Sequence, residues 1–214
     1  MTITRARITL LILTAMALLV MSGCLFSPAE KVDDDDPTVE FGPYTTPDEL
    51  VDNFILAWEH MVLEEYRDQI LYNGEEPTLD GNAYEQFKFY FIAGSYDDPF
   101  WGYGSEVDHT QALFSGSPGQ NDTPGVESID LSLNPFSDWS DFTGAIVEGD
   151  PAPTGCKGKT YFTNMTIQLK GTMPGGGDIN AFLVDDMIRF YVIPVDVDGT
   201  TEYRLWKWLD VAND

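Results

Sequence analysis

Residues 159–173 (KTYFTNMTIQLKGTM), 179–195 (INAFLVDDMIRFYVIPV) and 201–211 (TEYRLWKWLDV) are three long segments separated by short turns. Apolar and polar residues largely alternate in each segment, which is the period of a strand with one buried face. Pro174–Gly177 supplies the first turn, and the Asp198-Gly199 pair is typical of a two-residue hairpin. The stretch therefore predicts an antiparallel meander of three strands.

Three other segments also predict strands. Residues 126–133 alternate between polar and apolar side chains, and residues 144–148 form a second, shorter candidate. Residues 84–93 (YEQFKFYFIA) are rich in aromatic side chains and partly alternate, with Phe87, Phe89 and Phe91 on one side. The whole chain shows no internal repeat.

A helix is predicted ahead of these strands. Thr46 has the chemistry of an N-cap, Pro47 suits the first helical position, and Glu49 completes a capping box. The apolar residues that follow repeat at helical spacing and indicate a buried stripe: Leu50, Phe54, Ala57, Trp58 and Met61.

Two further helices are expected. Residues 62–71 place Leu63, Tyr66 and Ile70 on one face, and Asn73-Gly74 ends the pattern. Ser105 and Asp108 are similar to a second capping box, which predicts a short helix that continues to Phe114.

The order of helices and strands is that of an α+β fold, and it resembles the nuclear transport factor 2-like superfamily, also called SnoaL-like or cystatin-like. The resemblance covers residues 44–212 and lies in residues 46–58, 63–66 and 203–210. It implies a strongly curved antiparallel sheet that wraps its N-terminal helices into a cone with a pocket. The catalytic motifs of the enzymes in that superfamily have no residue-by-residue match here, and the superfamily also has many non-catalytic members.

The N-terminus predicts export and lipid attachment. Two arginines precede an apolar run over residues 8–21, a pattern typical of a signal peptide. Residues 19–24 (LVMSGC) resemble a bacterial lipobox, which implies a lipid on Cys24. Leu25 after this cysteine favours the outer membrane. The predicted organisation is a signal peptide over 1–23, a lipid-anchored acidic tether over 24–43 and a single α+β domain over 44–214.

The charge balance excludes one class of partner. The chain has 11 basic and 36 acidic residues, and the segment 1–23 holds two arginines and no acid, so the mature chain carries 9 basic and 36 acidic residues, a formal charge of −27. Such a surface repels phosphate backbones and anionic lipids, which argues against nucleic acid and leaves the lipid as the means of membrane attachment. The aspartates at 33–36 cannot pack together, which indicates an extended tether rather than a spaced calcium loop.

The candidate pocket residues are those that a cone would place inside it: Trp58, Tyr66, His109, Asp185, Trp206 and Trp208. In the pair Asp185-Asp186 one carboxylate must point inward or lie at a bulge, and Trp206 and Trp208 are expected on the same side of a strand. No metal-ligand spacing and no cofactor motif is present. Cys156 lies in a loop-like context without an evident activating group.

Three function classes remain, and one of them is a purely structural partner of an envelope complex, which an exposed apolar patch or an unpaired sheet edge would support. The other two concern binding and catalysis. The first is a membrane-anchored envelope lipoprotein whose domain binds or scaffolds a partner without catalysis. The alternative is a small-molecule isomerase, cyclase or dehydratase with its site inside the cone. An inward carboxylate close to His109 or a tyrosine, in a closed apolar cavity, would favour the enzyme.

Overall fold

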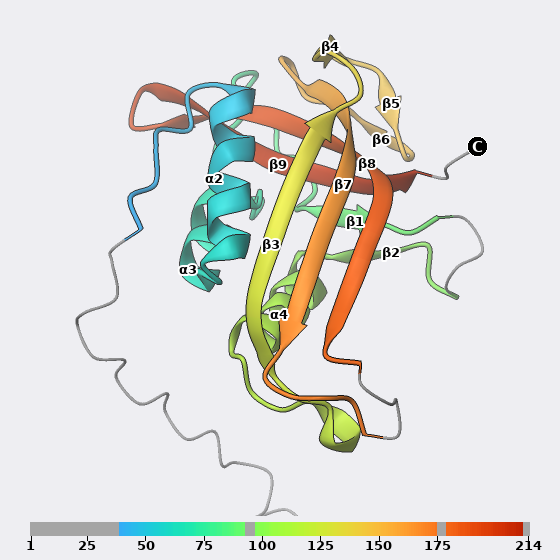
Figure 1. The fold of residues 1–214 in the computed structure, drawn as a ribbon. Coiled ribbons are helices and arrows are strands. Elements are labelled where there is room, and N and C mark those ends of the chain that lie inside the picture. The colour runs from blue at the N-terminus through green and yellow to red at the C-terminus, as the bar shows by residue number, and fades with distance from the viewer. Residues whose placement is uncertain (1–38, 93–96, 175–178, 212–214) are drawn as a thin grey trace, which may run out of the picture. The chain divides into compact units, whose positions relative to one another are not determined.

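The computed structural model describes residues 39–92, 97–174 and 179–211 (Figure 1). The fold below is that of the unit over residues 39–214. The predicted signal peptide, the lipid site at Cys24 and the aspartates at 33–36 lie outside the described residues.

One sheet organises the domain. Its strand order is β2-β1-β9-β8-β7-β3, with β4 also paired to β7. The strands are β1 (Lys88–Tyr90), β2 (Phe100–Gly102), β3 (Val126–Pro135), β4 (Ser140–Asp141), β7 (Lys157–Leu169), β8 (Ala181–Val197) and β9 (Thr200–Val211). The pairs β3–β7, β7–β8 and β8–β9 are antiparallel, which confirms the predicted meander, whereas the short β1 runs parallel to β9.

The predicted hairpin between the last two strands is confirmed. Asp198 and Gly199 both have positive φ, at 52° and 83°, as a tight two-residue turn between twisted strands requires. A second tight turn, at Glu148 and Gly149, joins β5 (Ile146–Val147) to β6 (Asp150–Pro151) in a separate two-stranded sheet. The strand expected over residues 144–148 is thus only two residues long.

The first helix forms as its sequence predicts. Helix α2 (Pro47–Glu59) begins after Thr46, whose hydroxyl accepts from the Glu49 backbone N–H while the Glu49 carboxylate accepts from the Thr46 N–H. These reciprocal bonds satisfy two N–H groups that the first turn leaves without a partner.

The other two helices differ from expectation. Residues 62–71 hold a short α3 (Leu63–Glu65) followed by a π-helix, η1 (Tyr66–Ile70), instead of one continuous α-helix. Helix α4 (Tyr103–Phe114) begins before Ser105 and is preceded by Gly102 without a side-chain cap, so the predicted Ser105–Asp108 capping box is wrong. A 3-10 helix, η2 (Gln120–Asp122), follows in the next loop.

Buried side chains form two clusters, one on each face of the sheet. The first, on the face toward α2, joins the helices to the sheet and is called the inner cluster here. The second, the outer cluster, lies on the opposite face and contains Tyr72, Val147, Ala152, Cys156, Tyr191, Ile193, Val195 and Trp206. Figure 1 shows β3 and β7 running across the direction of β9, β1 and β2, so the sheet is strongly curved. The predicted fold class, α+β with N-terminal helices packed in a strongly curved sheet, is confirmed.

A β-bulge in β9 changes which side chains face inward. Tyr191 pairs with Lys207 and Val192 with Leu205, so Trp206 is an additional residue on its strand. Trp206 consequently packs in the outer cluster while Trp208 packs against the inner one. The expectation that the two tryptophans share a side is wrong because the bulge shifts the alternation by one residue.

In the part of the chain that the structure describes, no helix combines the length and apolarity needed to cross a bilayer.

Candidate functional site

A cavity of about 230 Å³ lies between α2 and the inner face of the sheet. Its lining is mostly apolar, with two carboxylates and one hydroxyl. The lining residues are Phe54, Trp58, Phe89, Leu131, Leu133, Thr163, Met165, Val184, Asp186, Ile188, Trp208 and Asp210.

Strand register brings these residues together. Thr163 on β7 pairs with Leu133 on β3 and with Asp186 on β8, so one row across three strands points into the cavity. A second row, two residues away, consists of Leu131, Met165 and Val184. Residues two apart share a face of a sheet, and the alternation that buries the apolar residues also turns Asp186 inward.

Aromatic rings form one wall. Trp208 lies 5.6 Å from Phe54 and 5.0 Å from Phe89 between ring centroids, both in edge-to-face geometry. Trp58 stacks on Phe54 at 5.8 Å. These mutual contacts fix the rings before any ligand arrives, which lowers the entropic cost of binding.

Two carboxylates, Asp186 and Asp210, line the same cavity from adjacent strands. Asp210 pairs with Ile188, two residues from Asp186. Burial, and secondarily the negative charge of Asp186, raises the pKa of Asp210 to about 6. No salt bridge joins Asp210 to a lysine or arginine among the described residues.

Three polar atoms of the lining lack hydrogen bonds to the described residues. Thr163 is 3% exposed, and its Oγ1 has no partner among the described residues. Trp58 Nε1 and Trp208 Nε1 are also buried without a partner there. Since buried polar groups in native proteins are nearly always paired, such atoms in a cavity wall are sites that a ligand or water can satisfy.

The predicted pocket residues divide into three groups. Trp58 and Trp208 line the cavity. Tyr66 is fully buried beside Trp58, at 5.8 Å between ring centroids, but is not part of the lining. Its hydroxyl donates instead to Glu106 at 2.6 Å.

The remaining three lie elsewhere. His109 is exposed on α4, stacks on Trp101 at 4.3 Å and donates through Nδ1 to the Ser105 carbonyl. Asp185 is exposed, because the alternation of β8 turns its neighbour inward instead. Trp206 packs in the outer cluster and donates to the Glu85 carbonyl.

A buried carboxylate that sequence reasoning missed lies behind the aromatic wall. Glu106 is 3% exposed and accepts hydrogen bonds from Tyr66, from Trp101 Nε1 at 2.8 Å and from Thr110 at 3.3 Å. Burial raises the pKa of Glu106, while these three donors oppose the shift. The network anchors α4 to the π-helix and holds Tyr66 against Trp58.

The outer face carries a buried lysine. Lys207 donates to Asp150 at 2.7 Å and to the Val147 carbonyl at 2.6 Å, which fastens the β5–β6 hairpin to the sheet. Burial lowers the pKa of Lys207 and raises that of the Cys156 thiol to about 12. Cys156 is therefore protonated at neutral pH and inaccessible, as befits a packing residue.

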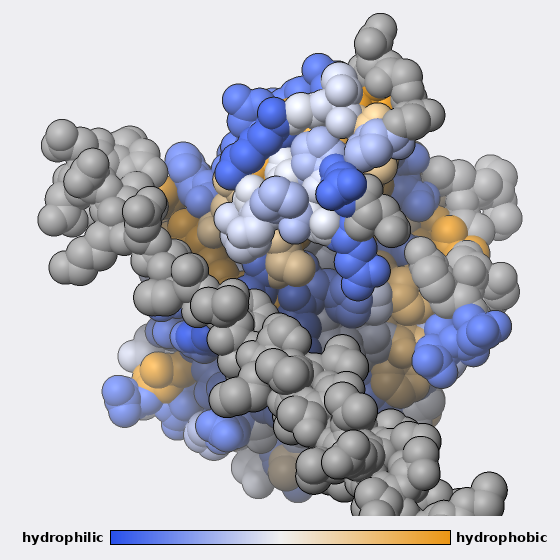
Figure 2. Space-filling model, turned by 90° about the horizontal axis from the view of Figure 1, so that it is seen from below, coloured by the Kyte–Doolittle hydropathy of each residue, from blue (hydrophilic) through white to orange (hydrophobic). Residues whose placement is uncertain are grey.

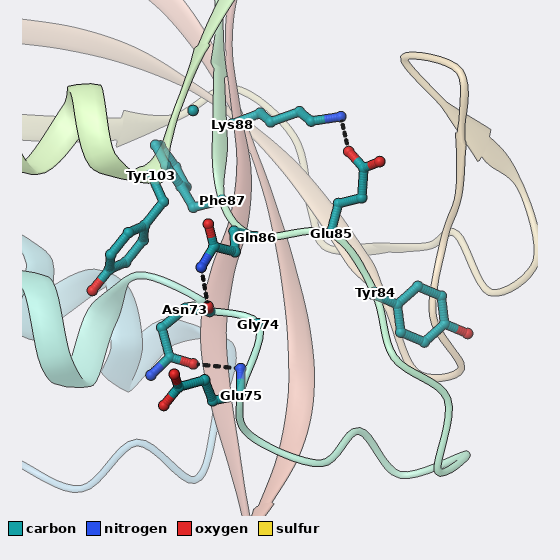
Figure 3. A pocket seen from close by; sticks show the side chains of 10 residues that line it. Asn73, Gly74, Glu75, Tyr84, Glu85, Gln86, Phe87, Lys88 and Tyr103 are labelled. Atoms are coloured by element: carbon teal, nitrogen blue, oxygen red, sulfur yellow. Dashed lines mark hydrogen bonds and ion pairs between the residues drawn. The ribbon is translucent and has the colours of Figure 1, made fainter.

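A larger groove of about 430 Å³ is open and polar (Figure 3). Its polar side chains already form hydrogen bonds with other residues that line the groove. Gln86 Nε2 donates to the Asn73 carbonyl at 2.6 Å, and Asn73 Oδ1 accepts from the Glu75 N–H at 2.8 Å. None of its lining residues has an unpaired buried side-chain atom among the described residues. The smaller apolar cavity is the better candidate site.

No group of three or more His, Cys, Asp or Glu side chains is arranged to hold a metal within residues 39–92, 97–174 and 179–211. On the face shown in Figure 2, hydrophilic residues surround smaller hydrophobic areas.

Comparison with known proteins yields likenesses in fold alone. No protein-family model matches the chain, and no curated protein matches it. A structure from Streptomyces avermitilis, described provisionally as a dehydratase of the NTF2-like family, is 18% identical with a TM-score of 0.40, over 78% of this chain and 100% of that one. An NTF2-like superfamily protein from Salmonella enterica is 8% identical with a TM-score of 0.41, over 78% and 87%. An uncharacterised protein with a cystatin-like fold from Caulobacter vibrioides is 9% identical with a TM-score of 0.38, over 78% and 87%.

Proposed function

We propose that this protein is a lipid-anchored envelope protein whose domain binds a small, largely apolar molecule in the inner cavity, without catalysis. The observation that carries the binding function is a cavity with a preformed aromatic wall and three buried polar atoms, Trp58 Nε1, Thr163 Oγ1 and Trp208 Nε1, that lack partners in the described part of the chain. Concave, mostly apolar sites with a few polar groups are the usual form of small-molecule sites.

The cavity volume limits the size of the ligand. At about 230 Å³ it is smaller than the roughly 300–1,000 Å³ common for drug-sized ligands. We therefore expect a compact molecule of about one ring, which 2-phenylethanol represents as a neutral probe.

Two neighbouring residues on β8 provide a matched test of binding. Val184 lines the cavity, whereas Leu183 is 79% exposed. The full chain in dodecyl maltoside is titrated with 2-phenylethanol by calorimetry. Val184→Trp is expected to fill the cavity and abolish binding, and Leu183→Trp to leave it intact, with circular dichroism confirming that both variants fold. Equal binding by the two variants would place the probe elsewhere and reject the proposal.

The anchoring part of the proposal rests on the lipobox-like residues 19–24 and on a mature charge of −27, which disfavours direct attachment to anionic lipid. Cells producing the chain are labelled with radioactive palmitate, and the membranes are fractionated. Cys24→Ala should abolish labelling and Cys156→Ala should not, and the labelled protein should sediment with the outer membrane. Label that persists in Cys24→Ala contradicts the anchor.

Asp210 favours a second candidate, an enzyme that transfers a proton on a small apolar substrate. Its carboxyl, with a pKa raised to about 6, lies in an apolar cavity and exchanges a proton near neutral pH. His109, the sequence-based partner for such chemistry, does not line this cavity. Exchange of the α-protons of cyclohexanone in D₂O, followed by NMR, tests this reaction: saturable acceleration that Asp210→Asn removes would support the enzyme, and its absence would reject ketone enolisation.

A further inference from the structure

We propose that the first part of β8 is a docking edge for a second copy of this chain, whose own β8 adds antiparallel to it and continues the sheet across a two-fold axis at Leu183. This inference goes beyond the proposed binding function, because it concerns the edge of the sheet and a protein partner.

Strand β8 extends further than its neighbour β9. Val211, the last residue of β9, pairs with Met187, whereas β7 pairs with β8 as far back as Ala181. Residues 181–185 therefore pair with β7 on one side and, within the part of the chain that the structure describes, with no strand on the other. In Figure 1 this part of β8 continues beside β7 beyond the level at which β9 crosses. We call residues 181–185 the open edge.

The alternation of the ladder shows which backbone groups face outward. The Leu169 N–H donates to the Asn180 carbonyl, so the even-numbered residues of β8 direct their N–H and C=O groups toward β7. The odd-numbered residues direct theirs to the opposite side. Ala181, Leu183 and Asp185 thus each present an N–H donor and a C=O acceptor along the open edge.

Apolar side chains are exposed at this edge. Leu183 is 79% exposed and Phe182 44%, and Ile179, just before the strand, is 47% exposed. Single exposed apolar residues are ordinary, but these three lie close together in one short segment. An exposed apolar edge strand is a template for pairing with another chain.

The two outermost strands of the sheet, in contrast, are protected. Strand β2 is only three residues long. On β3, the Glu59 carboxylate accepts from the Leu131 N–H at 3.3 Å, and Pro135, which has no N–H, ends the strand. Short strands, prolines and occupied backbone groups hinder the addition of a further strand. The open edge contains no proline and no lysine, so it is the better place for a strand to add.

The open edge is complementary to itself. An antiparallel copy centred on Leu183 places Leu183 opposite its counterpart, Ala181 opposite Asp185, and Phe182 opposite Val184. Odd-numbered residues then face odd-numbered residues, so the outward backbone groups of both copies form hydrogen-bonded pairs. The charged residue of the edge, Asp185, faces an alanine, so no like charges lie opposite each other. Such a two-fold contact closes with two copies.

The charge of the whole chain predicts how salt affects this contact. The formal charge of −25 repels a second copy, and salt screens that repulsion. Association through an uncharged edge should therefore increase with salt, whereas attraction to a basic partner would decrease. The paired segment is short, which places the interface among the small and weak ones. The proposed lipid anchor would raise the effective concentration by holding both copies on one membrane.

Two lysine variants test the register. Sedimentation velocity of the full chain in dodecyl maltoside gives the dimer fraction at 0.15 M and 1 M salt, where the Debye lengths are about 8 and 3 Å. Leu183→Lys places two ammonium groups opposite each other and should lower the dimer fraction by about fivefold or more. Asp185→Lys puts an ammonium on the same edge opposite Ala181 and should not lower it. Both side chains are exposed, and circular dichroism confirms that both variants fold.

Single cysteines locate the axis. The Cα atoms of a hydrogen-bonded antiparallel pair are about 5.5 Å apart, within the range of a disulfide, so Leu183→Cys should give a covalent dimer on mild oxidation. Thr166 pairs with Leu183 but lies on β7, one strand further from the axis. Its counterpart would be three strand spacings away, about 14 Å, so Thr166→Cys should not cross-link above background. The buried Cys156 is common to both variants.

The outcomes separate cleanly. A dimer that grows with salt, that Leu183→Lys abolishes, that Asp185→Lys retains and that Leu183→Cys captures supports the inference. A wild type that is monomeric at both salt concentrations, with no more cross-linking at 183 than at 166, overturns it. A dimer that persists in Leu183→Lys, or that both lysine variants lose equally, also overturns it, because two chains that merely share a micelle or use another register would respond in this way.

Discussion

Replacing Asp210 with asparagine should stabilise the protein at alkaline pH. Asparagine has nearly the shape of the aspartate but no charge, so it removes the cost of holding an ionised carboxylate in the apolar cavity beside Asp186. Most substitutions of half-buried residues lower the free energy of unfolding, whereas this one should raise it.

The magnitude follows from the pKa of Asp210. Burial and the charge of Asp186 raise it from an ordinary value of 3.8 to about 6. Because the folded state then holds its proton more tightly than the unfolded state, the free energy of unfolding falls as pH rises from about 4 to about 6, and the loss is complete above that range. A shift of this size corresponds to about 3 kcal/mol. Solvent screens the partly exposed carboxylate, so we expect a gain of about 1 kcal/mol at pH 8 for Asp210→Asn.

Urea unfolding of the full chain in dodecyl maltoside, followed by tryptophan fluorescence at pH 5 and pH 8, measures the effect. The gain at pH 8 should shrink toward pH 5, where the folded wild-type carboxyl is mostly protonated. Asp185→Asn, the exposed neighbour of Asp186, should stay within about 0.5 kcal/mol of wild type at both pH values. A variant at position 210 that is less stable than wild type at pH 8, or a gain independent of pH, would refute the reasoning.

Three further substitutions test the framework around the cavity. Glu106→Ala should cost about 3 kcal/mol in urea unfolding, because it leaves buried donors without an acceptor, whereas Glu64→Ala on the exposed face of α3 should cost less than about 0.5. Asp150→Asn should cost about 3 kcal/mol by leaving the Lys207 ammonium buried and unpaired, and adding Lys207→Met should recover most of that loss; no recovery would show that the pair is not the cause. Thr46→Ala should lower the free energy of unfolding by about 1 kcal/mol through loss of the N-cap, and an unchanged midpoint would contradict the cap's role.

Features with a local physical cause could be predicted from the sequence. The Thr46–Glu49 capping box and the Asp198-Gly199 turn depend on residues three positions apart or less, and both form as expected. The alternation in β7, β8 and β9 likewise predicts strands, because one face of each must be buried wherever the partner strands lie.

The candidate site was only partly predictable. The alternation requires one of Asp185 and Asp186 to face inward, but which one depends on the register of β8 with β7. The inward position of Asp210 could have been predicted, since Asp210 follows Trp208 by two residues and therefore lies on the same face of the strand. Glu106 gave no such signal, because its partners Tyr66 and Trp101 come from other elements of the chain.

By itself the sequence determined the helix start at Thr46, the three-stranded meander and the α+β class, all of which follow from interactions between near neighbours and from the need to bury one face of each element. Only the tertiary structure decided that Trp206 and Trp208 lie on opposite faces, since the bulge is defined by pairing with Tyr191 and Val192. It also decided that Asp186 and Asp210 share an apolar cavity, because the environment and pKa of a carboxylate depend on the distant residues that surround it.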